Sequence, residues 1–158
     1  MKIRLATPLD ASQIQSIYRP FVENTPITFE FDTPDISRLG IRIQTSLLYL
    51  VAEIGDTIVG YAYAAPHMDR PAYQYNALLS VYIAPAYSGK NIGKSLYREL
   101  ITQLKEKGYR NLYGCITLPN PKSIHLHESL GFIPCGLFRE TGYKLGKWHD
   151  VIWYELKL

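Results

Sequence analysis

The chain has 158 residues, 47% of them apolar, which is enough for one domain with a substantial core. Its 17 basic and 14 acidic side chains leave a net charge of only +3 without a long run of one sign, which argues against a nucleic-acid partner. The two cysteines form no CxxC pair, no segment reaches the roughly 18 apolar residues of a membrane span, and the first residues lack a signal-peptide pattern, so we expect a cytoplasmic protein without a membrane partner.

The first half of the chain predicts short strands and two helices. Residues 2–6 favour a strand, and residues 7–24 favour a helix that Pro20 should kink or end. Residues 25–33 form a loop that carries Phe29 and Phe31, and residues 34–47 predict a second helix. Two β-rich runs, 49–54 and 57–66, are separated by Gly55 and Asp56, which is typical of a hairpin.

The second half alternates strands and helices. Residues 76–85 are a third β-rich run, and residues 92–107 have one apolar helical face followed by Gly108, a residue typical of a helix end. A strand at 111–118, a short helix at 120–131 and two final strands complete the chain. Hairpin-linked strands followed by this alternation predict an α/β (α+β) fold with a mixed sheet, and a parallel pair that splays apart would let a ligand enter.

The segment APAYSGKNIGKSL, residues 84–96, leads from a strand into a helix. A helix N-terminus offers unpaired N–H groups, and nearby glycines let an anion approach the backbone closely. The segment is not a P-loop, because no Gly-Lys-Ser/Thr triplet ends a GxxxxGK spacing. By itself it is more typical of a flexible helix start. Further on, Asn120, Ser123 and His127 fall on one helical face, a spacing that a solvated face also shows.

Two longer segments resemble the core motifs of the GNAT acyl-CoA N-acyltransferases: SVYIAPAYSGKNIGKSLYREL and LPNPKSIHLHESLGF. More narrowly, four others resemble the phosphinothricin/methionine sulfoximine acetyltransferase branch: IYRPFVENTPITFE, GYAYA, RPAY and GYKLGKWHDV. The resemblance runs from Ile3 almost to the end of the chain. It implies a single GNAT domain over residues 1–158, with a mostly antiparallel six- to seven-stranded sheet, about four helices and a splayed central parallel pair, and it implies a homodimer.

The resemblance also implies acetyl-CoA as co-substrate and gives the positions that bind it. For the pantetheine arm and the pyrophosphate these are Val81, Tyr82, Ile83, Gly89, Lys90, Asn91, Ile92, Gly93, Lys94, Asn120 and, more weakly, Ser129. Two positions depart from the family pattern: Ser88 stands where Arg or Gln is usual, and Asn91 stands where a glycine is usual. Because Asn tolerates left-handed backbone angles, we expect the loop to form and CoA to bind.

A third departure concerns the catalytic base. The glutamate that in this branch precedes the SVY segment by two positions, and that deprotonates the acceptor amine, is Leu78 in this chain. An amine of pKa about 10 is neutral in about one part in 10³ at pH 7, a handicap of roughly 4 kcal/mol. His127 is a candidate general acid for the departing thiolate, although a structural histidine is the alternative. Glu30, and similarly His149, are weak candidate bases through water, and His67 is expected at the surface.

The acceptor site is expected around two loops. Phe29 and the RPAYQY segment correspond to regions that line the amino-acid pocket in the family. Within them Arg70 could pair an acceptor carboxylate, whereas Tyr73, Gln74 and Tyr75 would supply walls and hydrogen bonds. No metal is expected, because His125 and His127 are two apart on a helix and point to different faces.

These features together predict an N-acetyltransferase that moves acetyl from acetyl-CoA directly to the amine of a small molecule, an amino acid or analogue such as phosphinothricin or methionine sulfoximine. Neither cysteine is expected to form an acyl-enzyme. The alternative is an acyl-CoA-binding protein of the same fold, with weak or lost catalysis because Leu78 replaces the base. An aminoglycoside or protein N-terminal acetyltransferase is less favoured, because the resemblance outside the CoA motifs belongs to the phosphinothricin branch.

Overall fold

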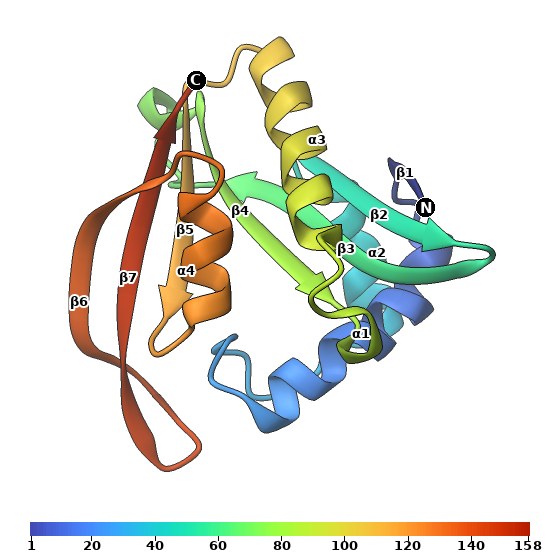
Figure 1. Cartoon of the computed structure of the whole chain (residues 1–158), viewed down its shortest axis with the longest axis horizontal. Coiled ribbons are helices and arrows are strands. Elements are labelled where there is room, and N and C mark those ends of the chain that lie inside the picture. Colours follow the sequence, from blue (N-terminus) through green and yellow to red (C-terminus); the bar gives the residue numbers. More distant parts are fainter.

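A computed structural model describes all residues from 1 to 158. It consists of a seven-stranded sheet with helices on both faces (Figure 1). The helices are α1 (Ala11–Asn24), α2 (Ile36–Thr45), α3 (Ile92–Glu106) and α4 (Pro121–Glu128). The strands are β1 (Lys2–Leu5), β2 (Leu48–Ile54), β3 (Thr57–Pro66), β4 (Asn76–Ile83), β5 (Asn111–Thr117), β6 (Ile133–Lys144) and β7 (Lys147–Lys157).

The sheet has the strand order β1-β2-β3-β4-β5-β7-β6. Its neighbouring strands are antiparallel except β4 and β5, which are parallel. These two strands pair only from Asn76 opposite Asn111 to Leu79 opposite Gly114, although β4 continues to Ile83 and β5 to Thr117. The prediction of a mixed, mostly antiparallel sheet with a splayed parallel pair is therefore confirmed.

Two hydrophobic clusters cover the two faces of the sheet. Along β2, Tyr49 and Val51 pack with α1 and α2, whereas Leu50 and Ala52 pack in the cluster that contains the apolar face of α3. Successive residues of a strand point to opposite faces, so a strand that is apolar throughout is buried on both sides. Residues of β4 and β5 belong to the α3-side cluster as well, so the same packing positions these two strands and the point where they separate.

The helix limits differ from the sequence prediction at one proline. Pro20 does not end α1, which continues to Asn24. A proline removes only one helical N–H donor, and the buried side chain of Val22 holds the next turn against the sheet. No helix is both long and apolar enough to cross a bilayer.

The two last strands form a long hairpin. Its outer part, beyond the pair that Thr117 makes with Val151, extends past the end of β5 toward the loop that follows α1 (Figure 1). The hairpin turns at Leu145 and Gly146, both of which have positive φ angles, so a glycine suits the turn. The hairpin thereby reaches a loop more than 100 residues earlier in the sequence.

Candidate active site

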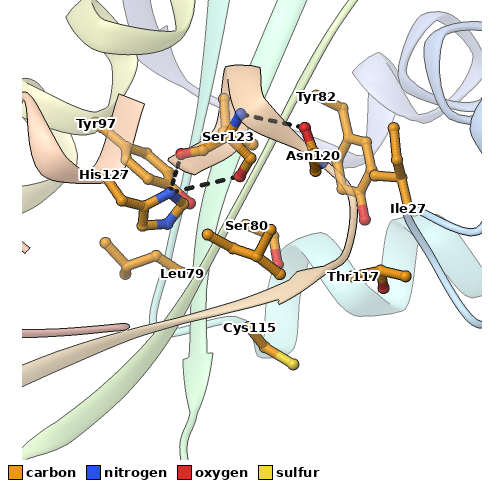
Figure 2. Close-up of a pocket in the computed structure, with 12 residues that line it drawn as sticks. Ile27, Leu79, Ser80, Tyr82, Tyr97, Cys115, Thr117, Asn120, Ser123 and His127 are labelled. Carbon is orange, nitrogen blue, oxygen red and sulfur yellow. Dashed lines mark hydrogen bonds between the residues drawn. The ribbon is translucent and has the colours of Figure 1, made fainter. Parts of the chain in front are cut away.

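A central cavity lies where β4 and β5 separate (Figure 2). It lies between side chains of the two strands and side chains that α3, α4 and the loop after α1 supply. Its lining consists of Ile27, Leu79, Ser80, Val81, Tyr82, Tyr97, Cys115, Ile116, Thr117, Asn120, Ser123 and His127. Four residues expected from the sequence, at positions 81, 82, 120 and 127, thus meet in one place.

The free edge of β4 faces this cavity. The backbone N–H of Ala84 donates to Val59 in β3, at 2.9 Å. Successive N–H groups of a strand point to opposite edges, so those of Val81 and Ile83 point toward β5, which no longer pairs with them. These two groups are therefore donors available to an extended ligand that takes the place of the missing strand.

Asn120 caps α4 beside the cavity. Its Oδ1 accepts a hydrogen bond from the backbone N–H of Ser123 at 3.2 Å (Figure 2), and Pro121 occupies the first helical position, where no donor is needed. The cap uses only the side-chain oxygen. The amide nitrogen of Asn120 remains available to donate to a ligand in the cavity.

His127 is buried, with 2% of its surface exposed. Its Nδ1 lies 2.7 Å from the backbone oxygen of Ser123 and must donate to it, which leaves Nε2 as an unprotonated nitrogen without a partner (Figure 2). Burial lowers the pKa of the imidazole, so the ring is neutral at pH 7. Since its only N–H is already used, this geometry suits a proton acceptor or a packing role better than the general acid expected from the sequence, a role that stays a prediction.

A second cavity, the α3 hollow, lies at the N-terminus of α3. Gly89 and Asn91 both adopt left-handed backbone angles, with φ of 80° and 59°, so the loop forms with Asn91 in the place of a glycine, as expected. The hollow is lined by Ile83, Tyr87, Ser88, Gly89, Asn91, Ile92, Gly93, Lys94, Lys122, His125, Leu126 and Ser129. Lys90 is not among these residues, and its ammonium lies 4.9 Å from the centre of the Tyr87 ring.

Two basic residues of the α3 hollow were missed from the sequence. Lys122 and His125 come from α4 and face the loop, and the Lys122 ammonium lies 3.4 Å from the hydroxyl of Ser88. Their positions in α4 gave no signal, because only the tertiary fold brings this helix beside the loop. With Lys94 and the N-terminus of α3, they make the hollow suited to an anionic group.

A third cavity, the outer hollow, opens onto the central cavity from the side of α1 and α2. Its lining consists of Tyr18, Ile27, Thr28, Phe29, Glu30, Arg42, Tyr63, Ser80, Tyr82, Cys115 and Thr117. Five of these residues also line the central cavity: Ile27, Ser80, Tyr82, Cys115 and Thr117. Phe29 and Glu30, which were singled out in the sequence, both lie here, and Arg42 is an addition from the structure.

The comparison with known proteins agrees with this arrangement. Residues 3–153 match the family described as "Acetyltransferase (GNAT) domain". The chain belongs to the GNAT acetyltransferase family. Enzymes of this family use acetyl-CoA, and the chain is accordingly an N-acetyltransferase.

Curated relatives and solved structures narrow the resemblance. The phosphinothricin N-acetyltransferase of Streptomyces viridochromogenes is 34% identical over 98% of this chain and 86% of its own. The L-methionine sulfoximine/L-methionine sulfone acetyltransferase of Salmonella typhimurium is 32% identical over 100% and 95%. The crystal structure of a phosphinothricin acetyltransferase from Sinorhizobium meliloti in complex with acetyl-CoA has a TM-score of 0.95, with 34% identity over 99% and 88%. A structure described as ribosomal-protein-alanine N-acetyltransferase, from Brucella melitensis, has the same TM-score, with 33% identity over both whole chains.

Glu30 is held in place in this GNAT chain. Its two carboxylate oxygens accept from the guanidinium of Arg42 at 2.8 and 3.2 Å, and one of them also accepts from the Tyr18 hydroxyl. Burial opposes ionisation of Glu30, but these hydrogen bonds outweigh it and leave the pKa of the carboxyl below its usual value. A carboxylate of low pKa that is already bonded three times is a poor base, so the structure gives the sequence-based candidate Glu30 little support.

The β6–β7 hairpin holds the loop that carries Phe29. The ammonium of Lys144, a residue that is 4% exposed, donates to the backbone oxygen of Thr28 at 2.7 Å. The Phe29 ring lies directly on Gly142, where a Cβ atom would come within 2.1 Å of the ring. His149, the other candidate base through water, bonds through Nε2 to the backbone oxygen of Lys144 at 2.9 Å. The hairpin therefore holds in place the loop that lines the outer hollow, although it supplies none of the lining residues itself.

The RPAYQY segment lies elsewhere in the chain. Arg70, Tyr73 and Gln74 line a separate depression, the loop hollow, together with Pro66 and Met68, and Tyr75 is exposed. Within one chain these residues do not meet Phe29. Their role in acceptor binding stays a prediction.

Cys115 lies closer to the chemistry than expected, since it lines both the central cavity and the outer hollow. The Cys115 residue is exposed to these two hollows, but the walls around its sulfur shield it from bulk water and raise the pKa of the thiol to about 11, so it is protonated at neutral pH and a weak nucleophile. Position alone therefore does not make Cys115 an acyl carrier. Cys135 lies on β6, away from both cavities.

Leu78 lies on the same face of β4 as Ser80, between Ala65 of β3 and Tyr113 of β5. It has no titratable neighbour on β4 itself. His67, which was expected at the surface, is partly exposed, but its ring stacks on Tyr113, with ring centres 4.0 Å apart. Leu78, at the position where the resemblance implied a base, and the His67 imidazole thus adjoin the same residue, Tyr113.

Proposed function

We propose that this GNAT enzyme transfers acetyl directly from acetyl-CoA to the amine of a small amino acid or analogue, such as phosphinothricin or methionine sulfoximine. The observation that carries the proposal is the junction of the central cavity with the outer hollow through five shared residues. A thioester in one and an amine in the other would meet beside Ser80 and Cys115. The named relatives act on amino-acid analogues, which supports the choice of acceptor.

The chain offers binding groups along the whole co-substrate. The α3 hollow suits the pyrophosphate through backbone N–H groups and the charges of Lys94 and Lys122. The N–H groups of Val81 and Ile83 suit the pantetheine arm, in the manner of an added strand. Backbone donors at this free edge would also polarise the thioester carbonyl and stabilise the oxyanion that forms on it.

The outer hollow suits a zwitterionic acceptor. Arg42 and Glu30 bring opposite charges to its wall, and Tyr63, Tyr82 and Phe29 provide aromatic surface. Three of the five guanidinium N–H groups of Arg42 remain beyond its two bonds to Glu30, and they could bind an acceptor carboxylate. This role was expected from the sequence for Arg70.

The test is an acceptor panel with purified protein and acetyl-CoA, followed by release of free thiol and by mass spectrometry of the product. Phosphinothricin, methionine sulfoximine and the common L-amino acids form the first arm, and an aminoglycoside and a peptide with N-terminal alanine form the second. We expect saturable thiol release, with product heavier by one acetyl group, in the first arm. Thiol release no faster than hydrolysis across the first arm would contradict the proposal, and turnover confined to the second arm would redirect it.

Direct transfer has its own readout. Initial rates should show both substrates binding before product leaves, and protein incubated with acetyl-CoA alone should carry no acetyl group on Cys115. The Cys115→Ser variant should retain turnover. Parallel lines in double-reciprocal plots, joined to acetylated Cys115, would contradict a direct mechanism.

The curated relatives named above are enzymes, which gives no support to the alternative of a protein that binds acyl-CoA without catalysis. We further propose that the enzyme acts in the cytoplasm and as a homodimer, in line with the sequence resemblance. Light scattering on the purified chain tests the second statement: a mass of one chain at micromolar concentration would contradict it.

A further inference from the structure

His67 occupies an unusual position at the end of β3. Ala65 of this strand pairs with Leu78, and Leu78 pairs on its other side with Tyr113. Two residues after Ala65, the His67 ring covers the Tyr113 ring at 4.0 Å, with the planes 16° apart. Leu78 and His67 therefore both adjoin Tyr113 on the same face of the sheet, the face toward which the outer hollow opens.

The surroundings of His67 form a hollow of about 240 Å³, here called the His67 hollow. Aromatic and sulfur-containing side chains line it, among them Met68, Phe138 and Trp153. Two buried polar atoms in it have no hydrogen-bond partner in the chain, Nδ1 of His67 and the indole nitrogen of Trp153. Such atoms are uncommon in folded proteins, and each calls for a water or a ligand.

The other titratable groups near the reacting atoms are less well placed to take the proton of the acceptor. Glu30 is bonded by Arg42 and Tyr18, and its pKa is low. His149 already bonds a backbone oxygen through Nε2. The unprotonated nitrogen of His127 lies against the backbone of Gly114, whose partner is Leu79, and therefore on the face of the sheet opposite to Leu78. Of the four histidines, only His67 has a ring without any hydrogen bond on the sheet face that bears Leu78.

We propose that His67 accepts the proton of the acceptor ammonium in place of a carboxylate at position 78. The inference rests on the proposed function and names its missing base. The ammonium loses one proton to the His67 imidazole, and the free amine then attacks the thioester carbon, so that a C–N bond forms and the C–S bond breaks. A second proton passes from the new amide nitrogen to the departing thiolate, and the imidazolium returns the first to solvent.

The proton travels through water. Tyr113 and Cys115 are neighbours on one face of β5 and lie roughly 7 Å apart, by the rise of a strand. Cys115 lines the outer hollow, and its partner in β7 is Trp153, which lines the His67 hollow. One or two bridging waters span such a distance, as they do in many active sites.

The charge state of His67 fits this role. Burial lowers the pKa of its imidazole, so the ring is neutral and able to accept a proton at pH 7. The ionisable groups around it are Tyr113 of β5 and Cys135 of β6, whose pKa values burial raises, so both are neutral at this pH. Glu155 of β7 lies next to Tyr113 and favours protonation of that phenol and of the Cys135 thiol.

His67→Phe is the central test, because phenylalanine keeps a ring on Tyr113 and removes the base. With an acceptor of amine pKa about 10, we expect kcat at pH 7 to fall about 10²-fold, the usual contribution of general base catalysis. The acid limb that His67 gives the wild-type pH profile should be lost, and the rate of the variant should instead rise with pH up to the pKa of the acceptor ammonium. Acetyl-CoA affinity and thermal unfolding should match the wild type.

Two further measurements separate proton transfer from packing. For acceptors whose amine is already neutral at pH 7, kcat of His67→Phe should be close to that of the wild type, since such acceptors need no base. Addition of Leu78→Glu to His67→Phe should restore most of the rate and move the acid limb to the range of a carboxyl group. Met68→Leu, a change in the same hollow without an ionisable group, should leave the profile unchanged.

The outcomes are distinct. A loss that is equal for acceptors of high and low amine pKa, or a His67→Phe profile identical to that of the wild type, overturns the inference and leaves the proposed function intact. Absence of turnover by the wild type with every acceptor removes the proposed function and the inference with it. Rescue by Leu78→Glu supports both.

Discussion

The two sides of the splayed strands are built from different material. On the CoA side, the donors are backbone N–H groups of the α3 loop and of β4, and the left-handed angles of Gly89 and Asn91 orient them. On the acceptor side, the walls are side chains that distant segments bring together: Lys144 bonds to Thr28 across 116 residues. A backbone site tolerates changes of side chain, whereas a site made of side-chain pairs changes its specificity with a single substitution.

Arg42→Met should produce the largest effect on the acceptor side. It removes the partner of Glu30 and a charge-assisted donor of the hollow, worth roughly 2 kcal/mol, or about 30-fold in affinity. We expect kcat/KM for the acceptor to fall by about that factor, with acetyl-CoA affinity within twofold of wild type. Arg38→Met, an exposed charge on the same helix, is the matched control. Equal losses for both substrates would show that the two sides are not independent.

Gly142→Ala should have the next largest effect. The new methyl group would overlap the Phe29 ring, so the loop of the outer hollow must shift. We expect KM for the acceptor to rise about tenfold while CoA binding is unchanged. Gly136→Ala on the same strand places its methyl group no closer than 3.8 Å to a neighbour and should be silent. Phe29→Leu in the Gly142→Ala background should recover part of the loss, and no recovery would argue against contact as the cause.

This contrast explains what the sequence could predict. The loop at residues 84–96 depends on local backbone requirements, which residue types reveal, and its passage from strand to helix was predicted, whereas the cap at Asn120 was not predicted although an Asn before a Pro is a local signal for it. Phe29 was found through resemblance and Glu30 as a carboxylate beside it. The bonds of Glu30 to Arg42, which make it a poor base, depend on packing between α1 and α2 and left no pattern in the sequence. The contacts of the His67 ring with Tyr113 and Trp153 were not predicted for the same reason, because β5 and β7 follow it by more than 40 residues. At Pro20 the local rule was too strong: a proline is expected to kink or end a helix, but tertiary contacts keep the residues after it helical as far as Asn24.

Substitutions at Asn91 sharpen the comparison on the CoA side. Its φ of 59° is left-handed, which glycine adopts freely and a β-branched residue adopts only at a cost of about 1–2 kcal/mol. Asn91→Gly should therefore bind acetyl-CoA as the wild type does, and Asn91→Val should bind it about five- to thirtyfold more weakly by calorimetry. Acceptor KM should be unaffected in both. A loss in Asn91→Gly equal to that in Asn91→Val would show that the amide side chain, not the backbone angle, is what the loop needs.

The smallest predicted effect concerns His127, the buried histidine of the central cavity, and is a dependence of the stability of the fold on pH. Burial lowers the pKa of His127 below 6.5 in the folded chain, so the unfolded chain binds a proton more readily as the pH falls through this range. The contribution to stability is thus complete above about pH 6.5 and is lost as the pH falls toward the folded-state pKa. Urea unfolding between pH 8 and 5 should show this loss, in a range above that where Asp10, Glu30 and Glu53, whose pKa values are also lowered, begin to take up protons.

The substitution His127→Gln should flatten this pH dependence only in part, because the pKa of His67 is lowered in the same direction. His125→Gln is the matched control on the same helix, since His125 is exposed, and should leave the slope unchanged. A slope in His127→Gln as steep as in the wild type would mean that the ring is protonated in the folded chain at pH 5. In that case Nε2 would also be protonated. The ring would then have a proton to donate besides the one bonded to the oxygen of Ser123, which would support the general-acid role predicted from the sequence.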